Sequence, residues 1–409
     1  MLSRLFFFLS VLVLAVGYGS VAAFMQWAPY PQIASAASTA LDLKEHWRND
    51  FGLTPTRQLV AAAPSDRPEY RRLNPTDVRP GGVLISGSLT HRGVLQGVAL
   101  FGPAGDKRHH WAIDYEALDP EGPRQTNVLL HGMAPFEDGS VVVAFDAGGV
   151  LARISACGAP QWVVRGGFHH AVTRDDDGGL WTWRGDSMVR VDAESGEILT
   201  EIDLRRDLIE TSGAHGALGI RMEESAEGLV YQADPFHAND VEALSREMAP
   251  AFPQFEAGDL LISLRDLNLV AVVDPNRREL KWWRHGPWFR QHDPDFQPDG
   301  RITVYDNRMG LDGGSRILAI DPETDAVETL FAHRPDAPFD SWRRGKHQVL
   351  ADGAILIAES EKGRVFEVNE DGALVWERQM IFDDARNVVI TDATHVPPGF
   401  FREGVFDCP

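Results

Sequence analysis

Three histidines recur at one distance from a turn glycine, and their side chains are capable of acid–base, nucleophilic or metal chemistry. The histidines are His131, His170 and His292, and the glycines that follow eight residues later are Gly139, Gly178 and Gly300. A repeated spacing of this kind indicates structural units in register. Each histidine would stand at the start of the innermost strand of its unit. We therefore expect the imidazoles to gather at the mouth of one central channel.

Further histidines occupy related places. They are His347 and His395, six and four residues before a glycine, His237, before Gly258 across an insertion, and His169, beside His170. If these histidines surround one channel, the candidates for binding a substrate are His131, His169, His237 and His395. The alternative is that these histidines have a structural role and hold one repeat unit to the next.

Converging imidazoles can bind zinc, copper or iron, but cysteine or glutamate partners are not in register with these histidines. Arg316 lies in the same unit as His292. A guanidinium repels a metal cation and binds a tetrahedral oxyanion through a planar fork of donors. The combination predicts an oxyanion site and no metal.

Strand-like runs follow turn glycines throughout the chain from residue 81 onward. The six glycines are Gly82, Gly139, Gly178, Gly258, Gly300 and Gly353, on average about 54 residues apart. This period is typical of the four-stranded blade of a β-propeller. Because residues 81–113 show only the later strands of a unit, the tail around Val388 to Phe406 is expected to supply the missing inner strand. We predict an all-β, six-bladed β-propeller closed by both ends.

The N-terminal segment is apolar from Leu5 to Met25, about the length that a membrane-spanning helix needs. A cleaved signal peptide is the alternative, since Val21-Ala22-Ala23 offers small residues at a suitable place. We predict residues 1–30 as anchor or signal, 31–80 as stalk and linker, and 81–409 as the propeller. The expected location is the bacterial inner membrane as a single-pass protein with a periplasmic body, or the soluble periplasm after cleavage.

Composition excludes several classes of function. The net charge of −21 argues against a nucleic-acid partner. Two cysteines, Cys157 and Cys408, are too few for a thiolate zinc cluster or a disulfide framework, and leave either one disulfide or two free thiols. Gly-rich nucleotide-binding motifs are lacking at strand-to-helix turns, so no cofactor is predicted.

Three segments carry a resemblance to a known family. They are the run Gly258–Asn268, the run Gln291–Phe296 with Tyr305-Asp306-Asn307 and Ser315-Arg316, and the run from Gly345 to Val368. Together they resemble the bacterial arylsulfotransferase (aryl-sulfate sulfotransferase) family over about Asn127 to Glu377, as a short membrane-anchored branch.

The resemblance implies a six-bladed propeller that moves a sulfuryl group from an aryl sulfate to a phenol without a nucleotide donor. His347 falls where the family has its nucleophile, and a sulfo-histidine would form there. His292 and Arg316 match positions that hold the sulfate group, and His170 is a further channel histidine. The implied partners are small aryl sulfates and phenols.

Two other functions remain open from the sequence. One is a non-catalytic periplasmic propeller that binds an anionic ligand or a partner protein. The other is a quinone-type or metal-dependent oxidoreductase, against which the lack of a repeated cofactor-stacking signature counts. Fold alone does not separate these possibilities.

Overall fold

The computed structural model describes residues 2–51, 53–62, 68–90, 93–214, 216–218, 222–225, 228–231 and 234–408. The chain forms two compact units, Met1–Arg57 and Gln58–Pro409. Residues 63–67, part of the expected linker, lie outside the described residues.

The first unit consists of two helices, α1 (Leu2–Phe24) and α2 (Tyr30–Asp50). Among the described residues, α1 is the one helix that is long and apolar enough to cross a membrane, with a mean hydropathy of 2.2 over Ser3–Phe24. A signal sequence has the same properties. The structure therefore agrees with the prediction of an N-terminal anchor or signal segment. The second helix, α2, begins after Pro29, has an Ala/Ser-rich sequence and is more polar than α1.

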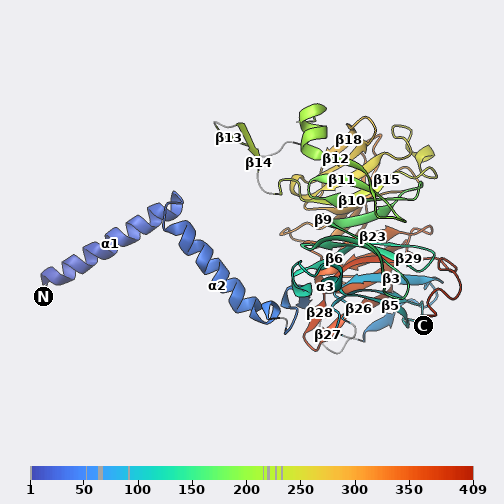
Figure 1. The fold of residues 1–409 in the computed structure, drawn as a ribbon, viewed down its shortest axis with the longest axis horizontal. Helices are drawn as coiled ribbons and strands as arrows, with labels where there is room; N and C mark the ends of the chain where they lie inside the picture. The colour runs from blue at the N-terminus through green and yellow to red at the C-terminus, as the bar shows by residue number, and fades with distance from the viewer. Residues whose placement is uncertain are drawn as a thin grey trace. The chain divides into compact units, whose positions relative to one another are not determined.

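The second unit is built almost entirely of antiparallel strands (Figure 1). Its first large sheet has seven strands in the order β12-β11-β10-β9-β8-β7-β6. These are β6 (Leu129–Pro135), β7 (Val141–Asp146), β8 (Gly149–Ile154), β9 (Pro160–Arg174), β10 (Gly179–Arg184), β11 (Ser187–Asp192) and β12 (Ile198–Asp203). The long β9 pairs with β8 through its first half and with β10 through its second half, so two four-stranded meanders share it.

Four more meanders follow the same plan. They are β15 (Ala238–Ala243), β16 (Leu260–Leu264), β17 (Leu269–Asp274), β18 (Glu279–His285); β19 (His292–Phe296), β20 (Ile302–Asp306), β21 (Arg316–Ile320), β22 (Val327–Ala332); β23 (Lys346–Val349), β24 (Ile355–Glu359), β25 (Arg364–Val368), β26 (Leu374–Gln379); and β29 (Ile390–Val396), β3 (Gly82–Gly87), β4 (Gln96–Phe101), β5 (Lys107–Ile113). In the last one β29 pairs with β3, so both ends of this unit share a sheet (Figure 1).

Shorter elements complete the two units. They are β1 (Leu59–Ala61), β2 (Tyr70–Arg72), β13 (Met222–Ser225), β14 (Gly228–Tyr231), β27 (Ile381–Asp383), β28 (Arg386–Val388), α3 (Tyr115–Leu118), η1 (Thr56–Gln58), η2 (Gln125–Asn127), η3 (Leu204–Thr211), η4 (Ala249–Ala251), η5 (Arg265–Leu267) and η6 (Ser360–Lys362). In the expected linker, β1 pairs with β28 and β2 pairs with β26 as added edge strands.

All six runs that follow a predicted turn glycine form the second strand of a meander. The turn chemistry explains this regularity. Asp138 Oδ1 accepts a hydrogen bond from the Ser140 amide, and Gly139 between them has a φ of +77°, a conformation that favours glycine. The apolar sequence Val141–Asp146 then extends as a strand whose first five residues are buried, because neighbouring sheets cover both of its faces.

The C-terminal tail is fastened to the second unit. A disulfide joins Cys157 to Cys408 across 251 positions of sequence, with 5.5 Å between the Cα atoms. The ring of Phe406 stacks on that of His109, with 4.2 Å between centroids, and meets Trp111 edge to face. Of the two states that the sequence left open, the structure has the disulfide.

Candidate functional site

The first strands of five of the six meanders carry β-bulges, β23 being the exception, and most of the candidate histidines lie in or beside these bulges. The pairing of β6 with β7 skips His131, and the pairing of β9 with β10 shifts between His169 and Val172. The pairing of β19 with β20 shifts just after His292. A bulge bends a strand and re-aims a side chain. The constant distance from histidine to turn glycine in the sequence thus reflects a bulge at a constant place.

The backbone at these bulges adopts a conformation that is uncommon for residues other than glycine. His170, His237 and Asp293 have φ values of +56°, +46° and +53°. Such conformations cost about 1–3 kcal/mol each and persist only where the surroundings hold them. They occur here where histidines from different strands meet.

The histidine cluster, which we define as His131, His169, His170 and His237, comes together from β6, β9 and the residue before β15. The ring centroids of His131 and His170 are 4.2 Å apart, those of His169 and His170 are 4.9 Å apart, and those of His170 and His237 are 5.4 Å apart. Burial lowers the pKa of His131, and it lowers that of His170 well below its usual value. Both rings are therefore neutral at pH 7.

Hydrogen bonds fix the tautomer of His170. The Nε2 of His169 lies 2.9 Å from the backbone oxygen of Gly185, which only accepts, so His169 carries its proton on Nε2. The other nitrogen of this ring, Nδ1, is then the acceptor. It lies 2.7 Å from Nδ1 of His170, which must donate to it. The lone pair of His170 is consequently on Nε2, a nitrogen that has no hydrogen-bond partner among the described residues.

Two carboxylates accompany the cluster. Asp234 Oδ2 lies 2.6 Å from Nδ1 of His237 and orients that ring. Asp146, at the end of β7, has Oδ2 3.6 Å from Nδ1 of His131. Burial opposes the ionisation of Asp146, but the neighbouring His170 and His131 outweigh it and hold its pKa well below the usual range. The cluster therefore combines imidazoles with negative charge.

His292 belongs to the same region. Its Nδ1 lies 2.7 Å from Oδ1 of Asn307, whose amide nitrogen donates to the backbone oxygens of Ser341 and Arg344. His292 must therefore donate from Nδ1, which leaves the lone pair on Nε2. Burial lowers its pKa well below the usual value, and the positive charge of Arg265 acts in the same direction.

Two arginines that the sequence analysis did not single out act on these histidines. The charge of Arg344 reaches His131, and that of Arg265 reaches His292. Burial lowers the pKa of both arginines, which remain charged beside Glu361 and Asp266. Arg265 lies inside the run Gly258–Asn268, and Arg344 directly precedes the run that begins at Gly345. The signal was present, but nothing in the spacing separated them from other arginines.

Beside the histidines lies an ionic cluster, which we define as Asp240, Glu242, Asp293, Asp295, Lys346, His347 and Asp392. Its side chains come from β15, β19, β23 and β29. The Lys346 ammonium contacts Asp240 Oδ1 at 2.8 Å and also contacts Asp293. Burial favours the neutral amine, but Asp240 and Asp293 outweigh it and raise the pKa of Lys346 well above its usual value.

The carboxyl groups of the ionic cluster have divergent pKa values. Burial raises the pKa of Asp240 to about 6, of Glu242 to about 8 and of Asp392 to about 7. For Asp293 burial acts in the same direction, but Lys346 and His347 outweigh it and lower the pKa to about 2. At pH 7 Asp293 is therefore ionised, whereas Glu242 keeps its proton.

His347 is held by this cluster. Its Nδ1 lies 2.9 Å from Asp293 Oδ2 and its Nε2 lies 2.9 Å from Thr303 Oγ1. Because ionised Asp293 only accepts, Nδ1 carries the proton, and in the neutral ring Nε2 accepts from the Thr303 hydroxyl. The side chain of His347 is 0% exposed.

Arg316 engages other partners than the histidines. Its Nε donates to Asp306 Oδ2 at 2.7 Å, and Nη2 donates to the backbone oxygen of Pro287 at 2.8 Å. Asp306 is its direct cross-strand neighbour, so opposite charges pair. None of the hydrogen bonds of Arg316 within the described part of the chain reaches His292 or His347.

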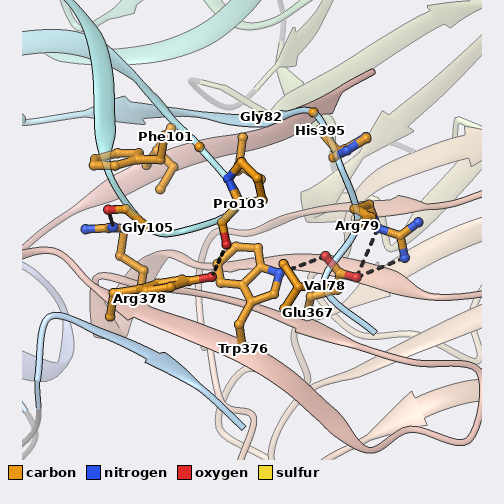
Figure 2. Close-up of a pocket in the computed structure, with 15 residues that line it drawn as sticks. Val78, Arg79, Gly82, Phe101, Pro103, Gly105, Glu367, Trp376, Arg378 and His395 are labelled. Carbon is orange, nitrogen blue, oxygen red and sulfur yellow. Dashed lines mark hydrogen bonds and ion pairs between the residues drawn. The ribbon is translucent and has the colours of Figure 1, made fainter. Parts of the chain in front are cut away.

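His395 lies at a different place, on the rim of a small cavity that Figure 2 shows. Its Nε2 lies 3.0 Å from the backbone oxygen of Pro80. The cavity of about 30 Å³ is bordered by an Arg79–Glu367 ion pair and by Trp376, whose indole N–H donates to Glu367. It has room for about two water molecules, not for an aromatic ring.

Comparison with known proteins identifies the family. The model of the Arylsulfotransferase (ASST) family matches residues 132–381, more than half of the chain. The chain belongs to the arylsulfotransferase family. The match contains His170, His237, His292, His347 and Arg316, and ends short of His395. Arylsulfotransferase membership was therefore predicted correctly from the sequence motifs.

Solved structures show the likeness of fold. A protein of unknown function from Bacteroides caccae is 12% identical, with 76% of this chain and 99% of that chain covered and a TM-score of 0.51. Virginiamycin B lyase from Staphylococcus aureus with quinupristin is 10% identical (77% and 89% covered, TM-score 0.44), and the WD40 β-propeller domain of Doa1 is 12% identical (78% and 86% covered, TM-score 0.43). None of the curated proteins matches the chain significantly. At 12% identity the likeness to the Bacteroides caccae protein concerns the fold alone.

Proposed function

We propose that the six meanders are the blades of a β-propeller whose first strands surround a central channel. Three observations support this architecture. Neighbouring first strands contact one another, with β6 beside β9 and β29, β15 beside β9 and β19, and β23 beside β19 and β29. The Thr391 hydroxyl donates to the backbone oxygen of Leu130, which links β29 to β6. The pairing of β29 with β3 would close the ring.

The proposed activity is transfer of a sulfuryl group from an aryl sulfate to a phenolic acceptor, without a nucleotide, through a sulfo-histidine. The observation that carries it is the gathering of neutral imidazoles within reach of two charged arginines, inside the region that matches the family. Imidazole nitrogen is a suitable nucleophile toward sulfur, and guanidinium groups stabilise charge on sulfuryl oxygens.

His347 is the proposed carrier. Ionised Asp293 holds the proton of the ring on Nδ1, so Nε2 is the nucleophilic nitrogen. The Thr303 hydroxyl must first turn away from Nε2. Nε2 then attacks sulfur, the bond from sulfur to the aryl oxygen breaks, and the phenolate leaves. In the second step the acceptor oxygen attacks sulfur, the N–S bond breaks, and the phenolic proton passes to a base.

The remaining residues have supporting roles. His237 is the proposed base, since Asp234 holds the proton of its ring on Nδ1 and leaves Nε2 as acceptor. Arg265, Arg344 and His292 would hold the sulfuryl oxygens, a role that the sequence assigned to Arg316 and His292. His131, His169 and His170 line the same region as substrate-binding residues. The small aryl partners would enter from the periplasm, with α1 as membrane anchor or signal segment.

The alternative is a propeller that binds an anionic ligand or a partner protein without turnover. One observation favours it, namely that His347 is fully enclosed and that both of its nitrogens have hydrogen-bond partners.

The test uses the full chain in detergent with p-nitrophenyl sulfate as donor, with and without phenol. Release of nitrophenol that needs phenol is expected for the wild type, and His347→Ala is expected to reduce it at least about a thousandfold. An exposed histidine replaced as His333→Ala is the matched control. Mass spectrometry after rapid quenching without acceptor is expected to find the sulfuryl group on His347.

Three results separate the hypotheses. Loss of activity in His170→Ala with retention in His347→Ala would move the carrier to His170. Activity lost in both histidine variants but not in the control supports the site as a whole. No phenol-dependent release by the wild type, together with tight binding of the aryl sulfate, would replace transfer by binding.

A further inference from the structure

Three side chains from adjacent strands bring donor atoms of metal-binding type together. They are His131 on β6, Asp146 on β7 and His170 on β9, and one donor atom of each lies within 4.8 Å of the others. We propose that these three residues form a binding site for a divalent transition metal of the zinc type. The proposal concerns binding and does not depend on which residue carries a sulfuryl group.

The separation of His131 from Asp146 supports a shared metal ion. Nδ1 of His131 is buried and has no hydrogen-bond partner among the described residues, although Asp146 Oδ2 is 3.6 Å away. That distance is too long for a good hydrogen bond. Two ligands at about 2.0–2.2 Å from a tetrahedral zinc ion stand about 3.4 Å from one another. A metal ion between the two atoms would satisfy a buried nitrogen that is otherwise costly to leave unpaired.

The second imidazole is oriented as a metal ligand. His170 presents the lone pair of Nε2 because its Nδ1 donates to His169, which in turn donates to the backbone oxygen of Gly185. Ligand histidines in metal sites usually donate their other nitrogen in this way, which fixes the tautomer and the ring plane. The left-handed backbone of His170, with a φ of +56°, sets the direction of the ring.

The donor set indicates which metal fits. Two imidazoles and one carboxylate suit zinc and its first-row neighbours, whereas magnesium and calcium prefer oxygen ligands alone. Three protein ligands leave a position open for water or for an anion. The side chain of Asp146 is 35% exposed, so an ion has a path to the site.

The sequence argument against a metal depended on Arg316 and on the lack of an acidic partner in register. Arg316 is paired with Asp306 instead, and the acidic partner is Asp146 on the adjacent strand. The positive charge of Arg344 acts on His131 and would oppose a cation there. Glu361, 2.8 Å from the Arg344 guanidinium, compensates that charge.

A second group with metal-ligand spacing consists of Asp293, Asp295 and His347. In this group the Lys346 ammonium already supplies the positive charge, because it contacts Asp293. The His347 nitrogens also have hydrogen-bond partners already. This group is therefore the weaker candidate and serves as an internal comparison.

The test measures metal binding to the full chain in detergent after treatment with a chelator. Cobalt(II) is titrated and followed by its visible absorption, and zinc(II) is titrated by calorimetry. We expect one ion per chain at this site, with visible bands of four- or five-coordinate cobalt. His131→Ala is expected to weaken cobalt binding at least about a hundredfold, and His169→Gln about tenfold to a hundredfold, because His169 orients a ligand.

Matched variants decide the outcome. His333→Ala and Asp295→Asn are expected to bind cobalt like the wild type, and Asp146→Asn, at a partly exposed position, replaces His131→Ala if that variant fails to fold. Binding that is unchanged in Asp146→Asn and His131→Ala, or lost only in Asp295→Asn, overturns the proposal. Because the assay measures metal binding, the metal site and the sulfuryl transfer are decided separately. Sulfuryl transfer that persists in metal-free protein does not contradict the metal site.

Discussion

Replacing Asp392 by asparagine tests the electrostatics of the ionic cluster. Asp392 is buried on β29, and Thr394 donates a hydrogen bond to its Oδ1. Charged groups face it from three other strands: Lys346 on β23, Asp293 on β19 and Asp240 on β15. Burial raises its pKa to about 7, against the opposing effect of Lys346. Asparagine imitates the protonated carboxyl group and keeps the oxygen that accepts from Thr394.

The size of the effect follows from the pKa difference between folded and unfolded protein. In the unfolded chain the carboxyl ionises near its ordinary value of 3.8, and in the folded protein it stays protonated to about pH 7. Its contribution to stability is therefore fully present below pH 3.8 and is lost as the pH rises through about 7. About three pKa units correspond to about 4 kcal/mol. Relative to wild type, Asp392→Asn should be nearly neutral at pH 4 and more stable by up to about 4 kcal/mol at pH 8.

Urea unfolding of the full chain in detergent, followed by tryptophan fluorescence at several pH values, measures this difference. Asp312→Asn, which changes an exposed carboxylate in a turn, is the control for the substitution itself. Other buried carboxyl groups titrate in both proteins, so only the difference between variant and wild type is diagnostic. A difference that stays constant from pH 4 to pH 8 would refute the assignment of a protonated Asp392.

Three further predictions concern other parts of the structure. Lys346→Met leaves buried carboxylates without their cation and should cost about 3–5 kcal/mol at pH 8, less at pH 5, in the same urea assay; an equal cost at both values would contradict this. Gly132→Ala would place a Cβ atom in steric clash with the backbone oxygen of His170, so lower thermal stability and weaker cobalt binding should appear together. An unchanged cobalt affinity would contradict the expectation that the backbone at His170 positions a metal ligand. Replacing Cys157 and Cys408 by serine removes a link across 251 positions and should lower the unfolding free energy by up to roughly 5 kcal/mol relative to the oxidised wild type, whereas the reduced wild type should unfold like the variant.

Several parts of the fold could be predicted because they depend on local chemistry. An aspartate and a left-handed glycine make the turn at Gly139, and the apolar run behind it extends as β7. The same pattern marks the other second strands, and the apolar composition of α1 marks a helix of membrane-spanning length. The family was evident from motifs that repeat in register.

The environment of the candidate residues could not be predicted in the same way. His347 was assigned a catalytic role from its position in a motif, yet its enclosure by Asp293 and Thr303 depends on how β19, β20 and β23 approach one another. Arg316 stood near His292 in sequence, but the strand register places it opposite Asp306.

The sequence by itself therefore determined the repeating strands, the apolar N-terminal helix and the family, because turn residues and hydrophobic alternation act over a few neighbouring positions. Only the tertiary structure decided that Asp146 adjoins His131, that Arg265 and Arg344 act on the histidines, and that the cysteines pair. These contacts join residues far apart in the chain, and the strand register and the bulges that create them are set by packing between sheets.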